Sequence, residues 1–133
     1  MTPESTHADS FYHDGRGPAL VRVHYDTITG SGIVAADFLN PDDTRDRLKH
    51  LLFVRAQAFQ FTPEEEYTNE WVDWARTGNA AIIDLGRSAW YRSFTNRHSS
   101  DCRHFHIMFY DEVLDIICHA VELKAGGYLQ DAL

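Results

Sequence analysis

Alternating apolar and polar positions near the start of the chain predict a β-hairpin. From Leu20 to Thr27 apolar side chains occupy every second position, and Ile33 to Leu39 has a matching apolar face. Gly30-Ser31 between the two segments suits a two-residue turn with glycine first, as in type II′ hairpins. Pairing about this turn sets Tyr25 opposite Ala36 and keeps the same face apolar on both strands.

The next segment predicts two helices. Asn40-Pro41 provides a capping side chain followed by proline, and apolar residues then follow helical spacing to Phe59. Residues 53–61 also alternate, which leaves open extended chain before Phe61. Thr62-Pro63-Glu64-Glu65 is a capping box, and an aromatic stripe with helical spacing follows it, ending at Gly78. The members of this stripe are Tyr67, Trp71 and Trp74.

Strand-like segments fill the rest of the chain, at residues 80–85, 88–94, 104–110 and 113–123. The order ββααββββ predicts an α+β fold, with two helices on one face of an antiparallel sheet of about six strands. We expect a single domain at residues 20–124, a flexible lead-in at 1–19 and a short tail at 125–133.

The last hairpin gathers histidines on one face. A turn at Asp111-Glu112 pairs His106 with Ile117 and His104 with His119, with Asp115 nearby on the diagonal. The opposite face is apolar and must point into the core; its members are Phe105, Ile107, Phe109, Leu114, Ile116, Cys118 and Ala120. His104, His106 and His119 are therefore candidate ligands of a divalent metal such as zinc or iron. The alternative is an ordinary half-exposed sheet face.

A second candidate site is electrostatic. From Arg87 to His106 the only acidic residue is Asp101, and arginines are interleaved there with aromatic residues. The candidate set is Arg87, Trp90, Arg92, Arg97 and Arg103, the side-chain types that bind a phosphate, a carboxylate or a nucleobase. The alternative is that these arginines pair with the abundant carboxylates elsewhere.

Signatures of catalysis are weak in this sequence. Ser88 and three further serines lie near histidines in the sequence, but no G-x-S-x-G motif is present. Cys102 is two residues from His104, a spacing that chance also produces, and Cys118 falls on the apolar face. Non-enzymatic function is therefore favoured.

Composition narrows the class of function. The net charge of the 133-residue chain is −8, which disfavours binding to nucleic acids. It suits a basic protein partner, and the alternative, favoured because many proteins carry such a charge, is that it serves only solubility. Two cysteines do not make a disulfide scaffold, and no apolar run reaches the length of a membrane span, so we expect a cytoplasmic protein without membrane contact. Exposed edge strands would allow a homodimer.

Three hypotheses follow from the sequence. The first is a small acidic protein-binding or regulatory domain of the inhibitor or immunity type, without catalysis. The second is a small-anion or nucleotide binder, or a minor enzyme, that uses the arginine–aromatic set. The third is a metal-binding protein that uses the histidine set.

Overall fold

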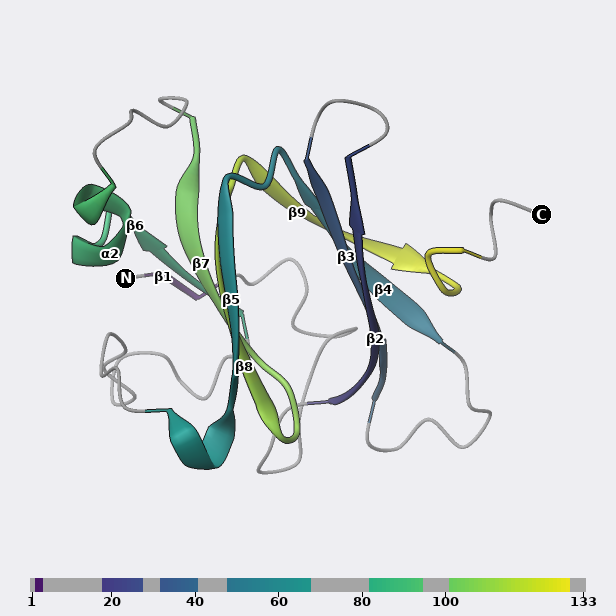
Figure 1. Ribbon diagram of the computed structural model, residues 1–133. Helices are drawn as coiled ribbons and strands as arrows, with labels where there is room; N and C mark the ends of the chain where they lie inside the picture. Colours follow the sequence, from purple (N-terminus) through teal and green to yellow (C-terminus); the bar gives the residue numbers. More distant parts are fainter. Residues whose placement is uncertain are drawn as a thin grey trace.

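Two antiparallel β-sheets packed face to face make up the described part of the protein (Figure 1). The computed structural model describes residues 2–3, 18–27, 32–40, 48–67, 82–94 and 101–129. Sheet A contains, in spatial order, β1 (Thr2–Pro3), β6 (Ile82–Gly86), β7 (Arg103–Met108), β8 (Glu112–Cys118) and β5 (Ala58–Pro63). Sheet B contains β2 (Ala19–Asp26), β3 (Ile33–Leu39), β4 (Lys49–Val54) and β9 (Ala120–Ala125).

The prediction of an α+β fold is wrong, because the model is mainly β. Eight strands of five to eight residues form two sheets of four, and the two-residue β1 extends sheet A. The described helical structure is a 3₁₀ turn, η2 (Glu64–Glu66), and a five-residue helix, α2 (Ala89–Ser93). None of the described helices is long and apolar enough to cross a membrane.

The predicted helix from Asn40 to Phe59 is replaced by β4 and the start of β5. Leu51 and Phe53 point into the core and are fully buried, whereas His50 lies on the other face. Leucine and phenylalanine at these positions satisfy helical spacing and strand alternation equally, and pairing with β3 and β9 decides for the strand. Residues 41–47, where the helix would begin, lie outside the described residues.

The second predicted helix is seen only in its first turn. Thr62 and Pro63 end β5, η2 follows, and Tyr67 already has an extended backbone. The predicted continuation through Trp71 and Trp74 lies outside the described residues.

The predicted strand at residues 88–94 is also wrong, because Ser88 caps helix α2 there. Its side-chain oxygen accepts a hydrogen bond from the backbone N–H of Tyr91 at 3.1 Å. Such a cap competes well with extended backbone over a short segment.

Both predicted hairpins are confirmed, each with a shifted register. Tyr25 pairs with Val34, and His106 pairs with Asp115 because Tyr110 and Asp111 form the centre of the second turn. Each shift moves the partner by two residues, so the side chains from Arg22 to Asp26 and those of the second hairpin keep their predicted faces. A bulge between Leu20 and Arg22 interrupts the alternation, and Leu20 packs against the core. The predicted apolar face of the second hairpin is accordingly found in the core, except Ala120.

The core lies between the two sheets. Sheet B supplies Val34, Ala36, Phe38, Leu51 and Phe53, and sheet A supplies Ile82, Phe105, Ile107, Phe109, Leu114, Ile116 and Cys118. These inner faces interdigitate in the manner of a β-sandwich.

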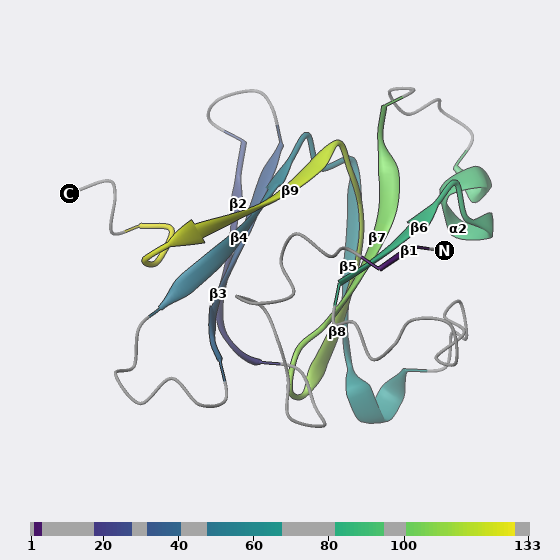
Figure 2. The same ribbon diagram turned by 180° about the vertical axis from the view of Figure 1, so that it is seen from behind.

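The two sheets are joined at a corner, where the β4–β9 pair of sheet B continues into the β5–β8 pair of sheet A. Val54 pairs with Ala120 in sheet B, and Ala58 pairs with Ile117 in sheet A, so β4 leads into β5 and β8 into β9. Figure 2 shows β9 running from the end of β8 into sheet B. The predicted long strand 113–123 is therefore divided at His119.

Candidate functional site

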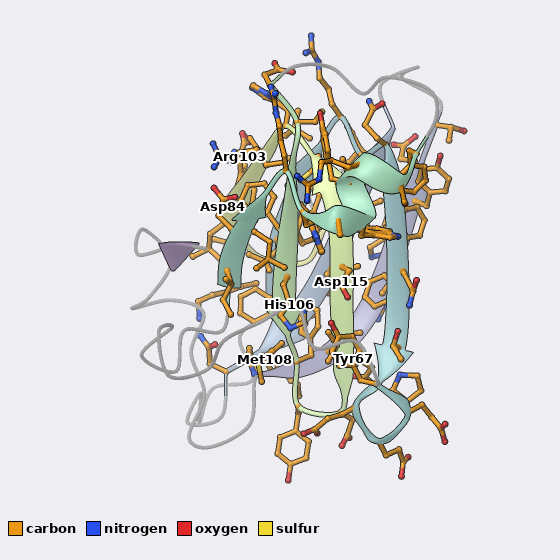
Figure 3. All side chains as sticks on the ribbon, turned by 90° about the vertical axis from the view of Figure 1, so that its left-hand side faces the viewer. Tyr67, Asp84, Arg103, His106, Met108 and Asp115 are labelled. Carbon is orange, nitrogen blue, oxygen red and sulfur yellow. The ribbon has the colours of Figure 1, made fainter. Side chains whose placement is uncertain are left out.

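A buried polar network lies on the face of sheet A that points away from sheet B. Figure 3 looks onto this face and shows His106, Asp115 and Tyr67 close together, with Met108 beside them. His104, His106 and Asp115 are each fully buried. Ile83 and Ile117 share the face and are also fully buried, so this side of sheet A is covered rather than open to solvent.

Asp115 is the centre of the network. Its Oδ1 lies 2.8 Å from His104 Nε2 and 2.8 Å from His106 Nδ1, and its Oδ2 accepts a hydrogen bond from the Tyr67 hydroxyl at 3.3 Å. Burial opposes ionisation of this carboxyl group, but the hydrogen bonds from His104 and His106 outweigh it and lower the pKa of Asp115 below its ordinary value. Asp115 is therefore a buried carboxylate held by two imidazoles.

Two aromatic side chains cover the imidazoles. The Tyr67 ring packs on His106 with centroids 5.5 Å apart, and burial, followed by the charge of Asp115, raises the pKa of its hydroxyl. The Trp90 ring packs edge-on against His104 at 4.9 Å. Trp90, predicted as a ligand-binding residue, thus covers the polar network.

Ser88 extends the network toward the surface. Its Oγ lies 2.6 Å from His104 Nδ1, and Ser88 is only partly buried. Because Oγ accepts the Tyr91 N–H, its own hydrogen is available for His104. Ser88, His104 and Asp115 therefore form a continuous hydrogen-bonded line from a serine hydroxyl to a buried carboxylate.

The predicted three-histidine set is not assembled. His104 and His106 lie on one face of β7 as predicted, but His119 sits at the corner between sheets, where its Nδ1 is 2.8 Å from Asp101 Oδ2. The two-residue register shift places Ile117 opposite His104, and the chain leaves sheet A after Cys118, so His119 does not meet His104. Within the described ranges, no group of three or more His, Cys, Asp or Glu side chains is arranged to hold a metal ion.

The predicted arginine set is brought together in part. Arg87 and Arg103 line one cavity of about 260 Å³ with Gly86, Asp101 and Cys102. Arg103 Nε also lies 2.8 Å from Asp84 Oδ2, the pairing expected under the alternative interpretation (Figure 3). Arg92 is exposed on α2, and Arg97 lies outside the described residues.

A different surface lies where the edges of the two sheets face each other. β2 ends sheet B and β5 ends sheet A, and the rings of Tyr25 and Phe59 meet across the gap at 5.1 Å. Phe59 also contacts Phe61 along β5, and Val23 lies beside Tyr25 on β2. We call Val23, Tyr25, Phe59 and Phe61 the aromatic seam; all except Phe61, which is partly buried, are exposed.

An acidic hollow follows the seam at the end of β5. It has a volume of about 640 Å³ and is lined by Pro63, Glu64, Glu65, Asp111 and Glu112. Burial, and then the neighbouring charge of Asp111, raise the pKa of Glu112. Crowded carboxylates of this kind favour a cationic group in the hollow.

Comparisons of the chain with protein-family models, with curated proteins and with solved structures gave no match.

Sequence reasoning missed Ser88 and Tyr67 as members of the polar network. The sequence pattern places Tyr67 in a helical aromatic stripe and Ser88 in a strand, and neither prediction links the residue to the histidines. Ser88, two residues after Gly86, could have been recognised as a helix cap, since Ser is favoured at that position. Neither the aromatic seam nor the acidic hollow has a local sequence signature, because β2 and β5 meet only through the arrangement of the sheets.

Proposed function

We propose that this protein is a protein-binding domain that adds an extended, basic segment of a partner to the outer edge of β5. The observation that carries the proposal is a sheet edge with exposed aromatic residues along it and a carboxylate-lined hollow at its end. The proposal develops the first hypothesis from the sequence, in which the partner is a basic protein.

The backbone of β5 supports strand addition. Among the described residues β5 pairs only with β8, which leaves its other edge without a neighbouring strand. The backbone N–H of Glu64 donates to Asp111 O, and alternation from that bond turns the N–H groups of Phe59 and Phe61 away from β8. Pro63 stands at the next position of that outer edge, where proline is tolerated.

The side chains around this edge define what would bind. An added strand would place alternate apolar side chains against the aromatic seam, which supplies affinity through buried area. Lysine or arginine near its end would enter the acidic hollow, whose lining of carboxylates attracts a cation. The net charge of −8 steers the same class of partner toward the molecule.

A model peptide tests the proposal directly. The probe is a fluorescein-labelled nonapeptide of alternating Lys and Val, and its control has Glu in place of every Lys. We expect saturable binding of the Lys peptide by fluorescence anisotropy at low salt, and no binding of the Glu peptide.

Matched variants locate the site. Phe59→Ala should weaken binding of the Lys peptide by at least about fivefold, or about 1 kcal/mol, which is part of the roughly 1.5–3 kcal/mol that full burial of a phenylalanine contributes. Phe94→Ala removes a similarly exposed phenylalanine from the end of α2 and should leave the affinity unchanged. Equal binding of both peptides, or wild-type affinity in Phe59→Ala, would falsify the proposal.

A further inference from the structure

Ser88, His104 and Asp115 have an arrangement that the protein-binding proposal does not use. The Ser88 Oγ–His104 Nδ1 distance is 2.6 Å, and the His104 Nε2–Asp115 Oδ1 distance is 2.8 Å. The two bonds leave opposite nitrogens of the same ring, so one imidazole connects a hydroxyl to a carboxylate. None of the three side chains belongs to β2, to β5 or to the lining of the acidic hollow, although Asp115 lies opposite Gln60 of β5.

The hydrogen bonds fix the direction of the protons. Asp115 is an acceptor and faces His104 Nε2, so Nε2 carries the ring proton of a neutral imidazole. His104 Nδ1 is then the acceptor, and the Ser88 hydroxyl, which already accepts from Tyr91 N–H, donates to it. His104 is thereby placed to remove the Ser88 proton, while Asp115 holds the ring in the required tautomer.

Burial separates the roles of the three residues. His104 and Asp115 are fully buried, and the Trp90 ring closes over the imidazole, so water does not compete for the His104–Asp115 bond. Ser88 is partly buried and stands at the surface end of the line. Ser88 is therefore the member of the line that an ester can reach, and the buried His104 lies within hydrogen-bond distance of it as a base.

We propose that Ser88 is a nucleophile toward small acyl esters, with His104 as its general base and Asp115 as a positioning residue. Ser88 Oγ attacks the ester carbonyl carbon, and its proton passes to His104 Nδ1. The bond between the carbonyl carbon and the leaving oxygen then breaks, and the alcohol takes that proton from His104.

The acyl group is released by the reverse sequence with water. A water molecule attacks the acyl carbonyl carbon and gives its proton to His104. The bond from that carbon to Ser88 Oγ breaks, and His104 returns the proton to Oγ. The products are a carboxylic acid and an alcohol, and no other reactant is required.

A covalent probe separates this role from helix capping alone. A fluorophosphonate is attacked by an activated serine, which forms a phosphorus–oxygen bond and releases fluoride. We expect the native protein to gain one equivalent of adduct by intact-mass measurement, mapped to Ser88 by peptide mass spectrometry. The protein unfolded in urea should gain none, because activation depends on the His104 and Asp115 geometry.

Variants complete the test. Ser88→Ala should abolish the adduct, whereas Ser93→Ala, which alters a serine on the same helix that donates to Trp90 O, should retain it. Asp115→Asn, once circular dichroism shows that it folds, should slow labelling at least about a hundredfold. Without the carboxylate His104 can adopt the wrong tautomer, which lowers the rate of such reactions by a large factor. If native wild-type protein takes up no adduct, or if Ser93 is labelled as readily as Ser88, the assignment is overturned, whatever the folding of the variants.

Discussion

Asp115 combines complete burial with three hydrogen-bond donors. Its Oδ1 receives both imidazoles at 2.8 Å, and its Oδ2 receives the Tyr67 hydroxyl. A buried carboxylate is tolerated only when its oxygens are satisfied in this way. The residue therefore links β7, β8 and the segment after η2, and its charge is a structural requirement of the covered face.

Replacing that carboxylate tests its contribution at the level of one residue. Asp115→Asn removes the charge and replaces one acceptor oxygen with an NH2 group, which then faces either the two imidazoles or the Tyr67 hydroxyl. We expect the free energy of unfolding to fall by about 3–5 kcal/mol, the usual cost of removing one member of a buried ionic group. Urea denaturation followed by tryptophan fluorescence at pH 7 measures it. Gln60→Asn on β5, an exposed control, should change stability by less than about 0.5 kcal/mol.

The pH dependence of stability provides a further expectation for Asp115. The folded-state pKa lies below the unfolded-state value, so the contribution of this carboxyl to stability is present above the unfolded pKa and is lost as pH falls through the folded pKa. The wild type should therefore lose part of its advantage over Asp115→Asn in urea titrations below about pH 4. A stability difference that stays constant down to pH 2 would contradict the lowered pKa.

Part of the buried polar network could be predicted from the sequence. Strand alternation places His104, His106 and Asp115 on the face opposite Phe105 and Ile107, and the two-residue register shift does not alter that face. His119 could not be placed, because the departure of the chain from sheet A at Cys118 depends on pairing with β4 in the other sheet. Ser88 required the helix cap to be recognised first.

At the level of elements, the corner between the sheets depends on Gly32. Its φ is +58°, a conformation that side chains other than glycine seldom adopt, and its carbonyl accepts the Ala56 N–H at 2.7 Å. A Cβ atom at this position would lie 2.8 Å from Ala56 O, which is backbone and cannot rotate away. Gly32 therefore allows the start of β3 to approach the β4–β5 connection.

Gly32→Ala tests this close approach. We expect a loss of at least about 1–3 kcal/mol, from the left-handed backbone conformation and from the displacement of Ala56. Thermal unfolding followed by circular dichroism measures the effect. Gly127→Ala is the control, since a Cβ there would meet its nearest atoms at 3.6–3.7 Å, an ordinary contact distance. Equal melting temperatures for the two variants would contradict the assignment to Gly32.

Strand and helix patterns differ in how well they predicted the elements. The two hairpins have clear alternation over six or more residues, and both formed. Residues 49–54 carry apolar side chains at spacings that suit either structure, and only the long-range partners β3 and β9 select the strand. Intrinsic propensity is a weak guide where tertiary pairing decides.

At the scale of the whole molecule, the peptide-binding site and the serine site lie in different places. The aromatic seam and the acidic hollow lie along β5 at the edge of sheet A. Ser88 and His104 lie beside α2, on the covered face of sheet A. A substitution in the peptide-binding site can therefore leave the side-chain contacts of the Ser88 site unchanged, and the reverse also holds. Loss of peptide binding in Phe59→Ala with full labelling of Ser88 would show that the two sites are independent.

The distribution of charge over the whole molecule leads to a last prediction, on salt dependence. If the acidic hollow holds the basic end of the partner, affinity for the Lys peptide should fall at least about tenfold between 50 and 500 mM NaCl, because exposed charges are screened over a few ångströms at the higher concentration. Glu64→Gln/Glu65→Gln should bind more weakly at 50 mM and lose much of this salt dependence. Asp101→Asn/Glu122→Gln removes two partly exposed carboxylates elsewhere and makes the same change in net charge, so it should behave as wild type if position decides. Identical salt dependence in both double variants would mean that only the overall charge of −8 attracts the peptide, and that the hollow has no specific role.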